Sequence, residues 1–308
     1  MKRKTINAVI TKKMSDWWQS IEDENLRNRV KANTVVTGGC IASMLLGENV
    51  NDFDVYMQDR QTAIDLSLLY VKQFAEHRRK AKGIETPIFV KHDDDRIKIV
   101  VKSAGVASED DSAANYQYFE ARPPEEAQAY IDEVMGDAVD KEAEAEAVAQ
   151  DAVAPPYRPV FLSTNAISLS GKIQVVVRFV GTPAEIHANY DYVHCTNYWT
   201  KAEGVVLNQP ALESLLTREL RYVGSRYPLC SVIRSRKFIQ RGWTINAGQY
   251  VKMLFQLNQL DLNDVAILED QLTGVDVAYF EQVISTLKEK GQDRVDSAYL
   301  LEIIDRMF

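Results

Sequence analysis

The sequence is poor in cysteine and histidine, the side chains that most often bind transition metals in proteins. Its 308 residues contain three scattered cysteines and four histidines. Three isolated thiols are too few for a disulfide framework or a zinc ribbon. The histidines (His77, His92, His187 and His194) also lack the spacing of metal ligands. We therefore expect neither a zinc site nor a disulfide-stabilised fold.

Long apolar segments are missing as well. No window approaches the ~20 uncharged apolar residues that a membrane-spanning helix needs. The apolar stretch near the N-terminus is shorter than the ~7–15 residues of a secretory signal and lacks a small-residue cleavage site. We therefore expect a cytoplasmic protein with no membrane contact.

Acidic residues are concentrated in one segment. The chain carries a net charge of −8, but residues 104–154 contain fourteen acidic and two basic side chains, a local charge of −12. The rest of the chain is therefore mildly basic, at +4. We expect an acidic insert at about 104–158 that forms a polar surface segment, partly helical or disordered. The alternatives are an acidic mimic of nucleic acid and a segment that docks a basic partner, and the sequence does not decide between them.

Hydrophobic periodicity predicts a mixed α/β half followed by helices. The predicted helices cover residues 14–31, 40–46 and 62–79, and the predicted strands cover 34–37, 52–57, 87–91, 96–101, 160–163, 166–169, 173–180 and 191–195. Thr182 is expected to cap a helix that begins at Pro183. The expected fold class is α+β, with a mixed-sheet domain over residues 1–208 and an all-helical domain over 209–308.

Two glycines and two aspartates form the pattern that carries chemistry. Gly38 and Gly39 join a predicted strand to a predicted helix, so the backbone can approach a triphosphate and the helix N-terminus can donate N–H groups. Asp52 and Asp54 lie two positions apart on the next strand, and therefore on one face of it. Two neighbouring carboxylates suit Mg²⁺, which leaves coordination positions for phosphate oxygens. Either feature alone is common, as a plain turn or a solvated strand face.

Strand, Gly-Gly, helix and Asp-x-Asp in this order resemble the signature of the DNA polymerase β-like nucleotidyltransferase superfamily. The fit is closest to tRNA-nucleotidyltransferase-like and phage-encoded members, and it is confined to about residues 33–58. The resemblance implies a nucleotidyltransferase-like fold, an NTP substrate and Mg²⁺ as cofactor. It makes Asp52 and Asp54 catalytic metal ligands, and places Gly38, Gly39 and Cys40 against the nucleotide. A phage-encoded member would act in the host cytoplasm.

The resemblance also implies a third carboxylate on a later strand. Asp191 is the best match, as a catalytic residue and metal ligand, and its rivals at 93–95 look like a hairpin tip. Superfamily members often have serine after the glycines, where this chain has Cys40, and a thiol is a poor donor to phosphate. A nucleophilic role for Cys40 lacks an evident partner base.

A basic segment follows the predicted α/β half. Residues 211–252 contain eight basic and two acidic side chains, and Arg234, Lys237 and Arg241 recur on one helix face. The aromatic residues Tyr222, Tyr227, Phe238 and Trp243 are interleaved with the cations. The segment loosely resembles the basic helices of template-independent RNA nucleotidyltransferases, which favours nucleotide or RNA binding by charge and stacking. The alternative is a buried set of aromatics beneath a solvated basic face.

Three functions fit the sequence. The first is Mg²⁺-dependent transfer of an NMP from an NTP to an acceptor hydroxyl, with the 3′ end of a tRNA-like RNA as one candidate acceptor. Asp191 would then complete the metal site and help to activate the hydroxyl. The second is the same chemistry on a small molecule or a protein side chain. The third is a non-catalytic binding or assembly protein of phage origin that keeps the fold and docks through its acidic insert.

Overall fold

The computed structural model describes residues 1–82, 88–93, 96–101, 156–163, 165–272 and 294. The acidic segment at 104–154 lies outside these residues. In chain order, the elements are α1 (Arg3–Gln19), α2 (Glu24–Asn33), β1 (Thr34–Thr37), α3 (Gly39–Leu46), β2 (Phe53–Met57), α4 (Arg60–Lys82), β3 (Ile88–His92), β4 (Ile97–Val101), β5 (Pro159–Leu162), β6 (Ala166–Leu169), β7 (Ile173–Val176), α8 (Pro183–His187), η1 (Val193–Cys195), β8 (Tyr198–Thr200), β9 (Gly204–Val206), α9 (Gln209–Thr217), α10 (Pro228–Gln240), α11 (Ala247–Leu257) and α12 (Val265–Leu272). Among the described residues, no helix combines the length and the apolar character that crossing a bilayer requires.

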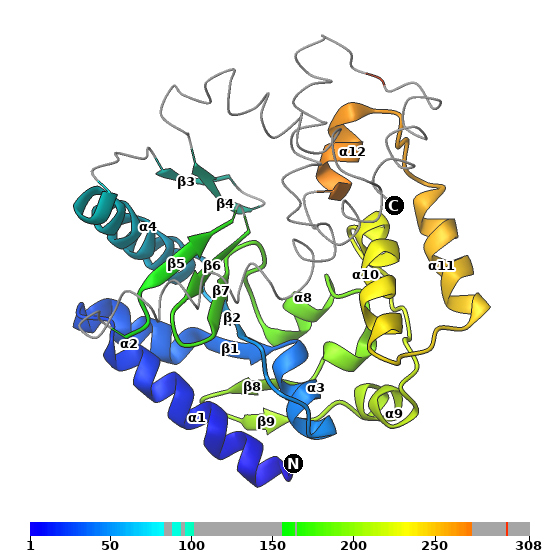
Figure 1. Cartoon of the computed structure of the whole chain (residues 1–308), viewed down its shortest axis with the longest axis horizontal. Helices are drawn as coiled ribbons and strands as arrows, with labels where there is room; N and C mark the ends of the chain where they lie inside the picture. Colours follow the sequence, from blue (N-terminus) through cyan, green and yellow to red (C-terminus); the bar gives the residue numbers. More distant parts are fainter. Residues whose placement is uncertain (83–87, 94–95, 102–155, 164, 273–293, 295–308) are drawn as a thin grey trace. The chain divides into compact units, whose positions relative to one another are not determined.

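The described residues fall into two compact units, with the boundary between Val223 and Gly224. The first unit contains every described strand together with α1–α4, α8 and α9 (Figure 1). The second contains α10, α11 and α12. Helix α9, which belongs to the helical domain in the sequence prediction, therefore lies in the first unit.

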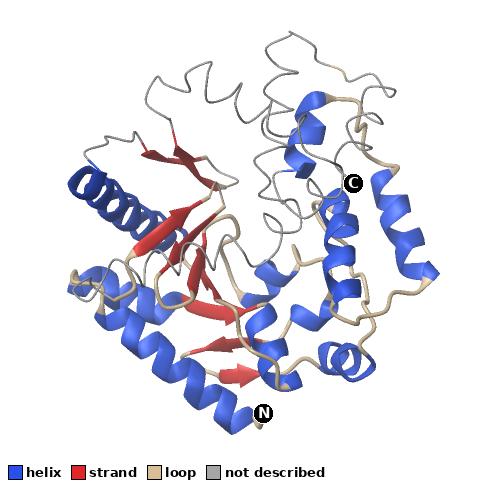
Figure 2. Ribbon diagram, viewed as in Figure 1, coloured by secondary structure: helices blue, strands red, loops and turns tan. Residues whose placement is uncertain are grey.

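A seven-stranded mixed sheet organises the first unit (Figure 2). Its strand order is β5-β6-β7-β2-β1-β8-β9. Strand β1 pairs antiparallel with β2 and β8, whereas β2 pairs parallel with β7. Strands β3 and β4 form a separate antiparallel pair. The mixed α/β fold with a mixed sheet that the sequence predicts is confirmed.

The two faces of the sheet are covered by different elements. The main core contains buried side chains from α1 to α4 and from one face of the strands, including Val36 and Val55. On the other face, Val35 and Tyr56 pack against Ile186 of α8. Because side chains alternate along a strand, Thr37 and Asp54 share this second face with Val35 and Tyr56. The predicted carboxylate site is therefore on the face that α1 does not cover.

Two predicted elements are wrong. The single helix over residues 14–31 is two helices, because the Asp23 carboxylate accepts the Leu26 N–H at 2.9 Å and starts a new helix. The strand over 191–195 is instead an isolated bridge at Tyr192 followed by the 3-10 helix η1. Strands β8 and β9, which extend the sheet beyond β1, have no counterpart in the prediction.

Candidate functional site

The site is built around the turn between β1 and α3. Gly38 has φ +88°, a backbone conformation that favours glycine. A Cβ at this position would lie 2.7 Å from Oδ2 of Asp54, so the carboxylate occupies the space that a side chain would need. At Gly39, a Cβ would have no atom within 4 Å. The turn therefore holds Asp54 beside the N-terminus of α3 and leaves open space at the first residue of that helix.

Asp54 and Asp52, two residues before it, both influence Cys40 at this turn electrostatically. Asp54 faces Thr37 across the β1–β2 pair, and Asp52 directly precedes β2. Both residues are half-buried. The pKa of the neighbouring Cys40 thiol is raised well above its usual value by burial first, then by Asp54, then by Asp52. Since one thiol is influenced by both carboxylates, the two acids concentrate negative charge at the start of α3, where the helix dipole favours it.

Cys40 is part of the turn and does not face the solvent. Its side chain is 3% exposed, and its thiol donates to the Thr37 carbonyl over 3.7 Å. Burial and the two aspartates raise the pKa of this thiol, so it stays protonated at neutral pH. A thiolate nucleophile therefore has no support here, and contact between Cys40 and a nucleotide would have to use its backbone.

A buried threonine links the end of β1 to α8. The hydroxyl of Thr37 donates to the Asn197 carbonyl at 2.8 Å, and Nε2 of His187 lies 2.7 Å from the same hydroxyl. Because a carbonyl can only accept, the single hydroxyl proton is used there, and His187 must donate its Nε2–H. Burial lowers the pKa of His187 to about 4, which agrees with a neutral ring at pH 7. The Gly38 N–H is also fixed, since it donates to the Cys195 carbonyl at 3.2 Å.

Two tyrosines adjoin the carboxylates on this face. The hydroxyl of Tyr190 donates to that of Tyr56 at 3.0 Å, and burial, Tyr56 and Asp54 raise the pKa of Tyr190. The helix before Tyr190 begins as predicted, because Thr182 and Glu185 form a capping box with Pro183 in the first turn. The spacing of Tyr56 from Asp54 could have predicted its place on this face. His187 and Tyr190 carry no such local signal, since tertiary folding alone brings them here.

Asp191 follows this helix and is half-buried. Its carboxylate accepts the Tyr192 N–H at 3.1 Å. Burial lowers the pKa of His194 to about 4, and the negative charge of Asp191 acts on this pKa in the opposite direction. Within the described part of the chain, no three His, Cys, Asp or Glu side chains form a group that could hold a metal, so Asp191 does not join Asp52 and Asp54 in such a group. Its role as third ligand stays a prediction.

The rival acid Asp93 directly follows β3. The Asp93 carboxylate accepts the Arg96 N–H at 2.9 Å, which is the hairpin-tip role expected of it. The other two rivals, at 94 and 95, lie outside the described residues.

The predicted basic face lies in the second unit. Arg234 and Lys237 are on α10, and Arg241 is the residue that caps its C-terminus. Lys237 and Arg241 are exposed, whereas Arg234 is half-buried. The aromatics expected between these cations do not present stacking surfaces: Tyr222, Tyr227 and Trp243 are buried, and Phe238 packs edge-on against Trp243 with ring centroids 6.1 Å apart. Nucleotide contact by the three cations stays a prediction.

The donor set at the turn fits one magnesium ion. Asp52 and Asp54 would offer two hard oxygen donors, and Mg²⁺ commonly takes one or two carboxylates and completes its octahedron with water and phosphate oxygens. The backbone at Gly39 is accessible beside them. The arrangement can therefore hold a divalent cation together with a phosphate group at the N-terminus of α3.

Comparisons with known proteins give one family and several distant structures. The family model of the Gabija anti-defense 2 family protein (Gad2) matches residues 8–218. No curated protein matches the sequence. Similar solved structures include the Thermotoga maritima CCA-adding enzyme complexed with tRNA (12% identity, TM-score 0.36, covering 90% of this chain and 53% of that one) and the Bacillus stearothermophilus CCA-adding enzyme with CTP (11% identity, TM-score 0.36, 88% and 50%). This chain thus spans about half the length of those enzymes, and likenesses with such low TM-scores decide nothing about its function.

Proposed function

Since this chain belongs to the Gabija anti-defense 2 family, we propose that it acts against the Gabija defence as a Mg²⁺-dependent nucleotidyltransferase. The observation that carries the chemical part of this proposal is the position of the Asp54 carboxylate against Gly38, at the N-terminus of α3. Asp52, which also influences Cys40 electrostatically, would add a second carboxylate. A carboxylate pair beside an open helix N-terminus suits a magnesium–triphosphate ligand better than it suits a structural role.

The chain's own residues would hold and orient the NTP. Asp52 and Asp54 would hold Mg²⁺, which when bound neutralises phosphate charge and favours ionisation of the acceptor hydroxyl. The amides at Gly39 and the next residues would bind the triphosphate. The acceptor oxygen attacks the α-phosphorus, the bond from that phosphorus to the α–β bridging oxygen breaks, and pyrophosphate leaves. The hydroxyl proton passes to solvent, or to Asp191 if that carboxylate reaches the acceptor.

The links behind the turn would keep this geometry fixed. The Thr37 hydroxyl, the His187 ring and the Cys195 carbonyl hold the end of β1 and the Gly38 N–H. Such preorganisation matters because nucleotidyl transfer depends mainly on positioning and on stabilising phosphate charge.

A second candidate is a non-catalytic protein that binds a component of the defence and keeps the nucleotidyltransferase-like fold. The observation that favours it is the lack, among the described residues, of a three-member acidic group able to hold metal. A catalytic site of this kind usually employs two metal ions and correspondingly more carboxylates.

A transfer assay tests the catalytic proposal. The protein is incubated with Mg²⁺ and each labelled NTP, alone, with bulk tRNA, or with protein from cells that carry the defence. We expect label in one acceptor fraction, loss of at least about 10²-fold in rate for Asp52→Asn and Asp54→Asn, and an unchanged rate for Asp16→Asn. Asp16 is an exposed acid on α1, which packs on the other face of the sheet. Equal turnover by all four proteins, or no turnover by the wild type, contradicts the proposal.

An infection assay separates the two candidates. Cells carrying the Gabija defence express the wild type, Asp54→Asn or Asp16→Asn, and phage plaques are counted. Catalysis is supported if Asp54→Asn no longer protects the phage, whereas the wild type and Asp16→Asn still do. Full activity of Asp54→Asn, at equal protein level, supports the binding protein.

A further inference from the structure

A second site lies in the first unit, on the opposite face of the sheet from Asp54. A groove of about 670 Å³ runs between α1 and the β8–β9 hairpin. Its volume is within the ~300–1,000 Å³ typical of ligand sites. Trp199 of β8 is paired with Val36 of β1 and belongs to the main core, which fixes the groove to the α1 side of the sheet. We propose that this groove binds the sugar–phosphate backbone of a nucleic-acid strand. The proposal does not rest on the proposed function.

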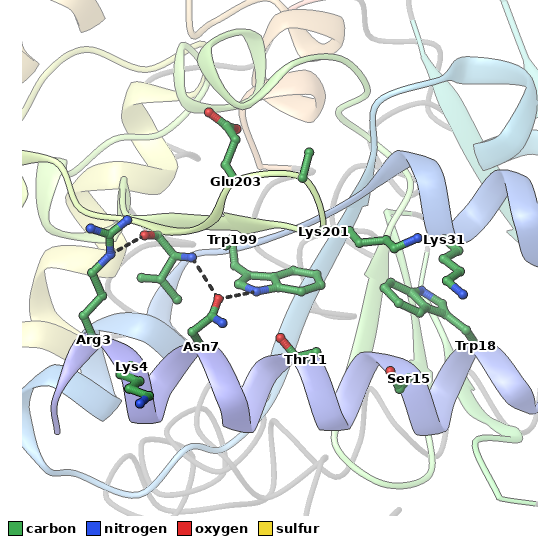
Figure 3. Close-up of a pocket in the computed structure, with 13 residues that line it drawn as sticks. Arg3, Lys4, Asn7, Thr11, Ser15, Trp18, Lys31, Trp199, Lys201 and Glu203 are labelled. Atoms are coloured by element: carbon green, nitrogen blue, oxygen red, sulfur yellow. Dashed lines mark hydrogen bonds between the residues drawn. The ribbon is translucent and has the colours of Figure 1, made fainter.

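Four cationic side chains and one acidic side chain line the groove. Arg3 and Lys4 lie at one end, and Lys31 and Lys201 lie at the other (Figure 3). Within the described part of the chain, no hydrogen bond or ion pair engages the side-chain ammonium groups of these three lysines. The acid, Glu203, lies near hydroxyl groups of β8, within 3.3 Å of the Thr200 and Tyr198 hydroxyls. The positive charge of the groove is therefore largely uncompensated by its own walls.

The floor supplies neutral hydrogen-bond donors. Asn7, Thr11 and Ser15 recur every four residues on α1 and so line one strip of the helix. The amide oxygen of Asn7 accepts from Trp199 Nε1–H at 3.0 Å and from the Val205 N–H at 3.2 Å. Since both partners are donors, the Asn7 oxygen must face them and its NH₂ group is left for another acceptor. Phosphate oxygens are acceptors of the kind that such a strip binds.

Arg3 is oriented for the same purpose. Its Nε donates to the Val205 carbonyl at 2.7 Å, which fixes the guanidinium at the groove wall (Figure 3). An arginine side chain has five N–H donors, so four remain for oxygen atoms of a ligand.

The length of the groove favours a chain over a single nucleotide. Trp18 is fifteen positions after Arg3 in α1, which is about 22 Å at 1.5 Å per residue. The cations form two pairs at the ends of this distance, whereas a triphosphate needs one compact cluster. A polyanion with repeated charges reaches both pairs.

The composition favours nucleic acid over a protein partner and predicts recognition without sequence preference. Trp18 and Trp199 are only 4% and 2% exposed, so the groove has neither the apolar centre of a protein interface nor a ring face for base stacking. Their indole N–H groups are used by Thr34 and Asn7. Lysines act as point charges that bind phosphate without reading bases.

Anisotropy of a labelled 20-nucleotide oligo(dT) tests the proposal with the full chain. We expect salt-dependent binding, with log K against log [KCl] falling by about 0.7 per phosphate contact. Lys31→Gln/Lys201→Gln should reduce that slope by about 1.4 and weaken binding about tenfold or more at low salt. Lys12→Gln/Lys72→Gln, which removes the same charge from exposed positions outside the groove, should bind as the wild type does. Circular dichroism establishes that both double variants are folded.

Several results would overturn this assignment. They are no binding by the wild type, equal losses in both double variants, or equal affinity for polyglutamate, which indicates an acidic protein instead. Displacement of the oligonucleotide by tripolyphosphate at equal phosphate concentration would identify a short free polyphosphate as the ligand. Asp54→Asn should bind the oligonucleotide normally, so failure of the groove and failure of the nucleotidyl-transfer site are distinguishable.

Discussion

Replacing Gly38 by alanine tests the geometry on which the site depends. The residue has φ +88° and ψ −148°, a backbone region that essentially only glycine adopts. The new Cβ would also lie 2.7 Å from Oδ2 of Asp54, so the carboxylate must move. Together these effects should lower the free energy of unfolding by about 1–3 kcal/mol. At about 2–4 °C per kcal/mol for a unit of this size, the first unit should melt several degrees earlier.

Gly39→Ala is the matched control, one residue further along. A Cβ there has no atom within 4 Å, and alanine is favoured over glycine in helices by up to about 1 kcal/mol. Its stability should therefore be unchanged or slightly higher. Urea unfolding followed by tryptophan fluorescence measures both variants, since Trp17, Trp18 and Trp199 report on the first unit. Equal stability of the two variants refutes the reasoning about Gly38.

Two further predictions concern cysteine and histidine side chains. Brief iodoacetamide treatment of the folded protein at pH 8 should modify the partly exposed Cys195 and spare the buried Cys40 and Cys230. Peptide mass spectrometry measures the labelling of each cysteine. Rapid labelling of Cys40 would contradict its buried position in the turn. Burial lowers the pKa values of His187 and His194 from the usual 6.5 to about 4. Between pH 6.5 and 4 the unfolded chain therefore binds more protons than the folded protein does. The folded protein should lose stability as the pH falls through this range. Urea midpoints across this range should depend less steeply on pH in His187→Gln, and an unchanged slope would show that His187 is not buried as described.

The local part of the site could be predicted from sequence because it is made by neighbours in the chain. The strand at 34–37, the turn at Gly38 and the next strand with Asp54 follow from glycine conformation and period-two alternation. The break between α1 and α2 cannot be predicted from periodicity, because the apolar spacing continues across it. Only the cap at Asp23 marks the start of the second helix.

The rest of the site depends on contacts between distant segments. Thr37 meets His187 and Asn197 only because α8 and β8 fold onto β1, and no spacing in the sequence encodes that contact. The short strand β8 carries only three residues, too few for a clear alternation. Similarly, the groove draws its cations from α1, α2 and the β8–β9 hairpin, so no single stretch shows them as a cluster.

Calorimetric titration with non-hydrolysable α,β-methylene NTP analogues, in Mg²⁺ and in EDTA, tests the central claim most directly. We expect the wild type and Asp16→Asn to bind at least one analogue in a Mg²⁺-dependent manner. Asp54→Asn should bind it at least about tenfold more weakly, because the metal loses one of its two carboxylates. Binding that is the same with and without Mg²⁺ and in Asp54→Asn, or no binding of any analogue, would contradict a metal–triphosphate site at Asp52, Asp54 and the Gly38 turn.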